Sequence, residues 1–232
     1  MFFVLCLVIT VPLSVAWKIL PVPNHIYAND ISGGLFKADI GKLSIGPYFV
    51  NNVHYNIRFL DFFKGKLSSD FNVKDSNLFA QGRLYHNFTY LGLNDSEFKI
   101  KLPWLMQMVP IPPHVPVTLD GDLHLDVVHF QQGKPYCNVL IGKAKVYDLT
   151  VMSFSDFALG DIFADLSCQD GNIVLSFDEN NTLKLSGDVI FLANQATKVN
   201  IRFKPDEEIS SLLGLVGLRK SKDGFFMINE QF

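Results

Sequence analysis

The sequence lacks the motifs of the common enzyme and nucleic-acid-binding classes. Its 3 cysteines form no Cys-x-x-Cys pair and no Cys/His cluster, which leaves zinc and thioredoxin-like chemistry without support. It has no serine in a nucleophile elbow and no glycine-rich loop ending in Lys-Ser or Lys-Thr. The net charge of -3 gives no basic footprint for nucleic acid. We therefore expect no enzyme, no cofactor, no small-molecule substrate and no nucleic-acid partner.

Apolar residues are plentiful by contrast. They make up 48% of the chain and include 21 Phe, while charged residues account for 19%, a balance that suits a folded domain with a packed core. The length of 232 residues allows one domain or two small ones.

The most apolar segment is at the N-terminus. No charge occurs from Phe2 to Trp17, and the stretch to Leu20 approaches the ~20 residues that a helix needs to cross a bilayer. A cleaved signal peptide is one alternative, but it requires a basic start, and bulky Trp17 follows the weak small-x-small site. A buried core helix is the other, although so uniform an apolar face is unusual for helices in small soluble domains. We predict an uncleaved transmembrane anchor over residues 1–22, with residues 23–232 outside the cytoplasm. No Lys or Arg precedes the run, so the positive-inside rule cannot orient it in the membrane. The position of the translation start therefore stays open.

The cysteines beyond the N-terminal run are Cys137 and Cys168. In an oxidising compartment such a pair forms a disulfide, and the closed loop of about 31 residues would be worth roughly 3–4 kcal/mol in the chain-entropy model. Two free, buried thiols are the alternative. We predict the disulfide, because we expect this part of the chain to lie in an oxidising compartment outside the cytoplasm.

A period of two runs through the rest of the chain. Apolar residues alternate with polar ones in three clear segments: Val53, Tyr55, Ile57 and Phe59; Leu183, Leu185 and Val189; and Val199, Ile201 and Phe203. Such alternation indicates strands with one buried and one solvated face, as in antiparallel sheets. The pairs Asp120-Gly121 and Asp170-Gly171 are typical of turns between such strands.

The predicted fold class is all-β. We expect the N-terminal transmembrane helix to be followed by a meandering antiparallel sheet, either curved or an open sandwich. One short C-terminal helix is predicted to open at Pro205-Asp-Glu-Glu208, because proline and acidic residues favour a first helical turn.

Five of the eleven prolines lie between Pro103 and Pro116. This segment predicts one or two helical turns and then an extended crossing. Together with a weak sequence similarity between the two halves of the chain, it suggests two similar β-units over about 28–102 and 117–232. Chance similarity among alternating strands is the other explanation.

The densest polar cluster is Asp122, His124 and Asp126, which would share one face of a strand. Two carboxylates beside an imidazole could bind a metal or carry out acid–base chemistry. A site also needs groups that converge from other strands, and none is evident in the sequence. We therefore interpret the cluster as the solvated face of a half-buried strand, and we predict no catalytic, cofactor or metal residue.

Several motifs occur in an order shared with a known family. They are Ile31-Ser-Gly-Gly-Leu-Phe-Lys-Ala38, Val53-His-Tyr-Asn-Ile57, Leu119-Asp-Gly-Asp-Leu-His-Leu125, Leu166-Ser-Cys-Gln-Asp-Gly171 and Leu212-Leu-Gly-Leu-Val-Gly-Leu218. Taken together, and over nearly the whole chain, the sequence resembles the type II secretion system protein N family, also called general secretion pathway protein N. It departs from the family where Leu35-Phe36 stands in place of a common tryptophan.

The resemblance implies a single-pass protein of the Gram-negative inner membrane with its bulk in the periplasm. It also implies a structural or assembly role beside other inner-membrane type II secretion components, in the export of folded proteins across the outer membrane. The alternative function is that of an AsmA-like envelope protein which binds lipid in the groove of a curved β-sheet. An open apolar groove would favour lipid, and a filled core would favour the assembly role.

Overall fold

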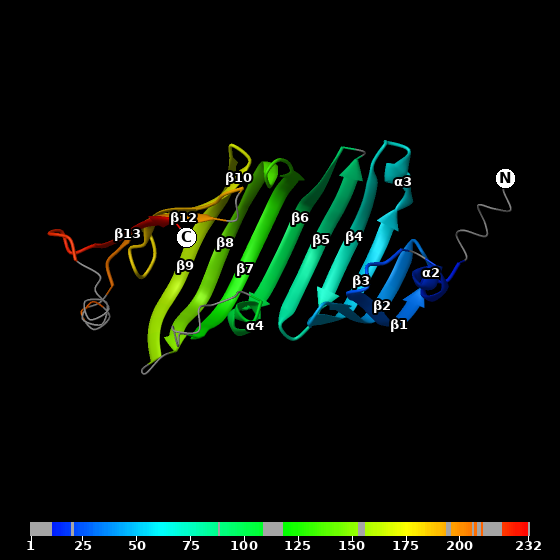
Figure 1. Cartoon of the computed structure of the whole chain (residues 1–232), viewed down its shortest axis with the longest axis horizontal. Coiled ribbons are helices and arrows are strands. Elements are labelled where there is room, and N and C mark those ends of the chain that lie inside the picture. Colours follow the sequence, from blue (N-terminus) through cyan, green and yellow to red (C-terminus); the bar gives the residue numbers. More distant parts are fainter. Residues whose placement is uncertain are drawn as a thin grey trace. The chain divides into compact units, whose positions relative to one another are not determined.

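The chain is almost entirely β-sheet. Its computed structural model describes residues 11–19, 21–87, 89–108, 118–152, 156–193, 196–205, 207, 210 and 220–231. In these residues, thirteen strands form an open antiparallel sheet in which each strand is bonded to the next one along the chain (Figure 1). The prediction of an all-β, meandering antiparallel sheet is therefore confirmed.

The chain divides into two compact units, Met1–Phe98 and Lys99–Phe232. The division falls inside β6, whereas the units expected from the sequence were 28–102 and 117–232. The similar construction of the two units stays a prediction.

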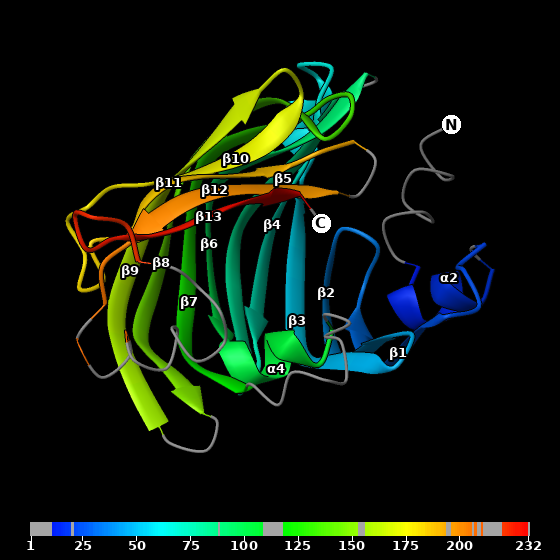
Figure 2. The same cartoon turned by 60° about the vertical axis from the view of Figure 1, so that its left-hand side comes forward.

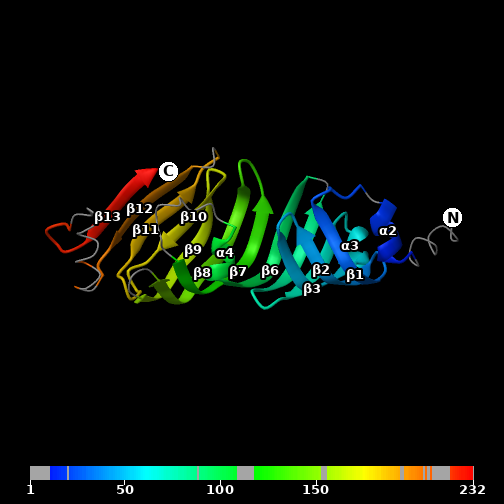
Figure 3. The ribbon, with the colours of Figure 1, turned by 60° about the horizontal axis from the view of Figure 1, so that its bottom comes forward.

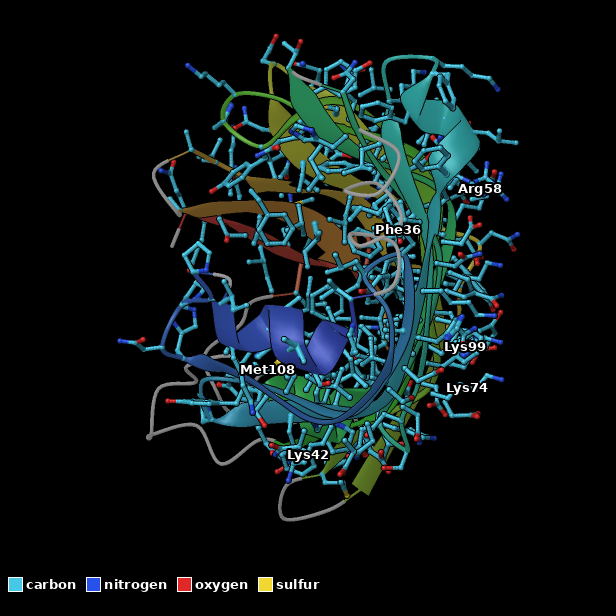
Figure 4. The ribbon with its side chains drawn as sticks, turned by 90° about the vertical axis from the view of Figure 1, so that its right-hand side faces the viewer. Phe36, Lys42, Arg58, Lys74, Lys99 and Met108 are labelled. Carbon is cyan, nitrogen blue, oxygen red and sulfur yellow. A yellow bond between two sulfur atoms is a disulfide. The ribbon has the colours of Figure 1, made fainter. Side chains whose placement is uncertain are left out.

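Within its described residues, the first unit has two short helices and six strands, the last of which ends just beyond it. These elements are α2 (Leu13–Ile19), β1 (Ile26–Gly33), β2 (Lys37–Ile45), β3 (Tyr48–Arg58), α3 (Phe59–Phe62), β4 (Leu67–Lys74), β5 (Leu78–Asn87) and β6 (Tyr90–Lys101). The strands of this unit curve around α2 (Figure 4).

The core of the first unit lies between α2 and the apolar face of β1–β3. Leu13 of α2 is buried against Ala38 and Ile40 of β2, and Trp17 packs on the same cluster. Val53 lies opposite Ile40 in the neighbouring strand, on the face that the alternation predicts. The sheet therefore buries its apolar face under a helix built from the N-terminal apolar segment.

The second unit contains α4 (Leu102–Met106) and strands of two lengths. The long strands are β7 (Thr118–Gln132), β8 (Cys137–Met152) and β9 (Asp156–Gln169); the short ones are β10 (Asn172–Phe177), β11 (Ser186–Phe191), β12 (Thr197–Phe203) and β13 (Phe226–Gln231). Figure 2 shows the three long strands side by side, and Figure 3 shows the short strands following them in order. At the C-terminal edge, the ring of Phe226 is buried and stacks on Phe203 with centroids 5.8 Å apart.

Cys137 and Cys168 are joined by a disulfide between the start of β8 and the end of β9. The turn that follows β9 lies beside it: Asp170 and Gly171 have φ of 50° and 80°, the positive values that a tight Asp-Gly hairpin requires. The Gly171 carbonyl accepts the N–H groups of Tyr136 and Cys137 at 3.0 and 3.1 Å. Turn and disulfide therefore stabilise the same corner of the unit.

Three local predictions were wrong. Phe59 does not continue the apolar face of β3: it starts α3, and its ring is exposed. Asp120-Gly121 is not a turn but a register shift within β7, where Gly121 approaches the Tyr147 carbonyl too closely for a side chain. Residues 183 and 185 are buried in the loop that precedes β11, not on a strand.

The short helix predicted after Lys101 is present as α4, with Pro103 in its first turn. The extended crossing predicted after it, at 109–117, and most of the predicted C-terminal helix lie outside the described residues.

The predicted anchor, residues 1–22, is described only from residue 11 onward. Within the described part of the chain, no helix has the length and apolar character needed to cross a bilayer. Leu13–Ile19 forms α2, whose buried side chains contact the sheet. A membrane span over the whole of residues 1–22 would therefore have to release α2 from β1–β3.

Candidate functional surfaces

The first unit has a polar sheet face opposite α2, formed by the alternate residues of β2–β5. His54 Nδ1 lies 2.6 Å from Asp39 Oδ1, and the residues occupy facing positions of β3 and β2. Figure 4 shows Arg58 and Lys74 on one side of this sheet and Phe36 on the other. The period of two in the sequence accounts for this separation of polar and apolar side chains.

Asp70 lies between two arginines on this face. It accepts hydrogen bonds from Arg58 Nε at 2.6 Å and from Arg83 Nε at 3.1 Å. Partial burial opposes ionisation, but the two arginines outweigh it and lower the pKa of the Asp70 carboxyl below its usual value. The group is therefore a stable carboxylate between two cations, which does not suit a general acid or base near neutral pH.

Two open hollows lie along this polar face. The larger, of about 590 Å³, is lined largely by polar residues of β1–β4, among them Asp39, His54 and Lys74. The second, of about 420 Å³, is lined by residues of β3–β6 that include Asp70 and Arg83. Neither resembles the apolar pockets that hold most small ligands.

The Asp122–His124–Asp126 cluster lies on β7, as predicted, with its three side chains half-buried. Each contacts a side chain of a neighbouring strand. Lys101 Nζ lies 2.8 Å from Asp122 Oδ1, and Lys145 Nζ lies 3.3 Å from Asp126 Oδ2.

The imidazole of His124 meets the ring of Tyr147 edge to face, with centroids 4.8 Å apart. The three side chains thus turn to separate partners on β6 and β8 and do not converge on one another. Among the residues that the structure describes, no group of three or more His, Cys, Asp or Glu is placed to hold a metal ion. The cluster has the geometry of cross-strand pairs on a solvated sheet face.

A third hollow, of about 270 Å³, lies on the second unit over β8–β10. Its lining includes Lys143, Lys145, Asp165 and Asp178 beside Phe163. Like the hollows of the first unit, it is mainly polar and mixes both signs of charge.

Sequence reasoning missed one surface, the exposed turn at Phe59–Lys66. Alternation assigned Phe59 to the buried face, whereas Phe59, Leu60, Phe62 and Phe63 all project into solvent. The signal was present in the sequence: Phe-Leu-Asp-Phe-Phe places four large apolar residues within five positions, which period two cannot bury on one face.

Fold and surfaces together define an all-β protein with an open antiparallel sheet, whose first unit is apolar on one face and polar on the other. The chain belongs to the type II secretion system protein N family, whose model matches residues 24–229. It is therefore a component of type II secretion, an envelope-associated system, and family membership implies that it acts with other components of that system.

Two curated relatives are named type II secretion system protein N. The protein of Aeromonas hydrophila is 24% identical over 208 residues, covering 88% of this chain and 82% of that protein. The protein of Vibrio cholerae serotype O1 is 20% identical over 201 residues, covering 86% of this chain and 75% of its own. No solved structure matches the chain significantly.

Proposed function

We propose that this chain is a structural assembly subunit of the type II secretion system, held at the inner membrane with its sheet in the periplasm, and that it catalyses no reaction. The observation that carries the proposal is the pairing of its candidate chemical groups. Asp122, His124 and Asp126 each face a different partner on a neighbouring strand, so these three side chains do not form a convergent site for a substrate.

The proposed membrane attachment rests on the apolar run Phe2–Val11. This run is followed in the sequence by Pro12 and α2, whose Leu13 and Trp17 pack on the sheet. The proposed attachment is thus adjacent in sequence to the core of the first unit. Tethering raises the effective concentration of the sheet near other inner-membrane components, which is the advantage expected of an assembly subunit.

The packing of α2 supports this role over the lipid-binding alternative. An acyl chain needs a continuous apolar trough. Part of the apolar sheet face, at β1–β3, is instead filled by α2, whose Leu13 is buried against Ala38 and Ile40.

The test is a secretion assay in a strain that lacks this gene and shows a secretion defect. The variant replaces only residues 2–11 with a cleavable signal peptide and keeps α2, because removing Leu13 and Trp17 would damage the core. We expect the released form to accumulate in the periplasm, fold and fail to restore normal secretion. Full secretion by the released form would contradict the proposed membrane-held role.

The matched control carries the same signal peptide followed by an unrelated transmembrane helix before α2. This variant restores membrane attachment without the natural residues 2–11. We expect it to restore secretion, which separates the need for a tether from a need for the particular sequence.

A further inference from the structure

The turn at Phe59–Lys66, which we name the aromatic turn, carries a compact apolar surface. Phe59, Leu60, Phe62 and Phe63 are between 47% and 76% exposed. The three phenyl rings contact one another, with centroids 5.6–6.4 Å apart, so the surface is continuous. Leu67, at the start of β4, is exposed beside them in sequence. Adjacent large apolar residues exposed to this extent indicate a surface that another phase or molecule covers.

The acidic residue of this turn does not contribute to that surface. Asp61 accepts a hydrogen bond from Ser68, which is buried, and pairs with Lys64 at 3.7 Å. The Ser68 hydrogen bond lowers the pKa of the Asp61 carboxyl. Its charge is thereby held at the sheet, where it locks the turn in place and leaves the outward side apolar.

Two lysines border the apolar surface. The side chain of Lys64 is 74% exposed, and Lys66 lies over the ring of Tyr85, 5.9 Å from its centroid. Phenylalanine and leucine bordered by lysines suit the boundary of a bilayer, where rings enter the acyl region and ammonium groups reach the phosphates. The net cationic border favours anionic lipids.

The aromatic turn also lies close to the point where the apolar run Phe2–Val11 joins the sheet. Pro12, directly after that run, forms a bridge with Gly34. Two residues on, Phe36 meets the ring of Phe59 edge to face, with centroids 6.0 Å apart. The end of the N-terminal apolar run and an exposed aromatic surface thus lie near each other on the first unit.

We propose that the aromatic turn inserts into the headgroup–acyl boundary of an anionic bilayer and acts as a second membrane contact beside the N-terminal run. The inference rests on the proposed location at the inner membrane. A second contact beside the N-terminal run raises the affinity for the bilayer above that of either contact alone. It also fixes how the first unit is oriented on the membrane, because two contact points restrict its rotation.

The experiment places a nitroxide label on the full chain, reconstituted in vesicles of phosphatidylethanolamine and phosphatidylglycerol at about three to one. Cys6→Ser removes the cysteine of the N-terminal run, and Cys137 and Cys168 are bridged. The label is attached through Phe63→Cys or, as a second site, Leu60→Cys. The matched control is Phe49→Cys, an exposed Phe at the opposite end of β3. Accessibility to oxygen is compared with accessibility to a water-soluble nickel chelate.

We expect labels at positions 60 and 63 to favour oxygen over the nickel chelate several-fold more than the label at 49. Lys64→Glu with Lys66→Glu should reduce that preference. Suppose the chain floats with the vesicles but the labels at 60 and 63 show no more preference for oxygen than the label at 49. That result would overturn the inference about the aromatic turn and leave the proposed membrane location standing. A chain that does not float would overturn the proposed membrane location as well. Labels that become shielded only when other secretion components are added would assign the surface to a protein partner and contradict the bilayer.

Discussion

Two glycines at tight turns of this sheet have a positive φ but differ in how closely other atoms surround them. Gly171 has φ of +80°, and a Cβ there would lie 2.1 Å from the Lys134 carbonyl oxygen. Gly46 has a similar positive φ of +59°, but a Cβ there would meet no atom within 4 Å. Comparing alanine substitutions at the two glycines therefore separates the cost of backbone strain from the cost of steric overlap.

We expect Gly46→Ala to cost about 1 kcal/mol in the free energy of unfolding, which is the strain of a left-handed alanine. Gly171→Ala should cost at least ~3 kcal/mol, because backbone strain is joined by a clash with main-chain atoms. Denaturant unfolding of both variants checks the difference. Equal costs would mean that the β9–β10 turn shifts to accommodate the added methyl group without a further loss of stability.

At the scale of single residues, the Asp70 carboxylate should make the stability of the fold depend on pH. Because its pKa is lowered in the folded state, its contribution to stability is present above the unfolded value of about 3.9 and is lost as pH falls through the folded value. Asp70→Asn should therefore cost stability at pH 7, by less than about 1 kcal/mol for so exposed a group. That cost should vanish in acid. A cost that stayed constant from pH 7 to below pH 3 would show that charge is not its source.

At the scale of the element, strand β12 keeps the alternation that its sequence predicts. Ile201 is half-buried and faces Ile228, whereas Asn200 is exposed. We expect Ile201→Glu to destabilise the chain by roughly 2–3 kcal/mol, since it moves an unpaired charge into the apolar face. Asn200→Glu should change stability by less than about 0.5 kcal/mol. Thermal unfolding compares the two, and equal losses would mean that the register of β12 is wrong by one residue.

The disulfide between β8 and β9 gives a second test at this scale. Alkylation of the denatured chain without reductant should label Cys6 but neither Cys137 nor Cys168. In the control Cys137→Ser, the released Cys168 should become reactive. Labelling of all three thiols in chain isolated from the periplasm would contradict the bond.

Alternation predicted most strands, but it was misleading at residues 183 and 185, which lie in a loop, and it did not reveal the interruptions within strands. Val199, Ile201 and Phe203 lie where period two places them, because a half-buried strand imposes that spacing. Gly121 was misinterpreted because a glycine after aspartate fits both a turn and a bulge, and only the partner strand decides between them. The contacts of Asp122 and Asp126 were equally hidden, since Lys101 and Lys145 come from other strands and pairing register cannot be read from one segment.

At the scale of the whole molecule, the sheet separates two kinds of surface. Its polar face carries cross-strand ion pairs such as Arg58–Asp70, and part of its apolar face is covered by α2. Family membership places the protein in type II secretion. In the proposed role, the sheet positions surfaces for other components while the N-terminal run and the aromatic turn hold it at the membrane.

The most direct test of the central claim is secretion by a variant that combines Asp122→Ala, His124→Ala and Asp126→Ala. A deletion strain with a demonstrated secretion defect receives either this variant or the wild-type chain, at matched protein levels. Because these side chains form only exposed or half-buried cross-strand contacts, the variant should fold and restore secretion as the wild type does. Loss of secretion by a variant that still folds and carries its disulfide would contradict a purely structural role and make this cluster a functional site.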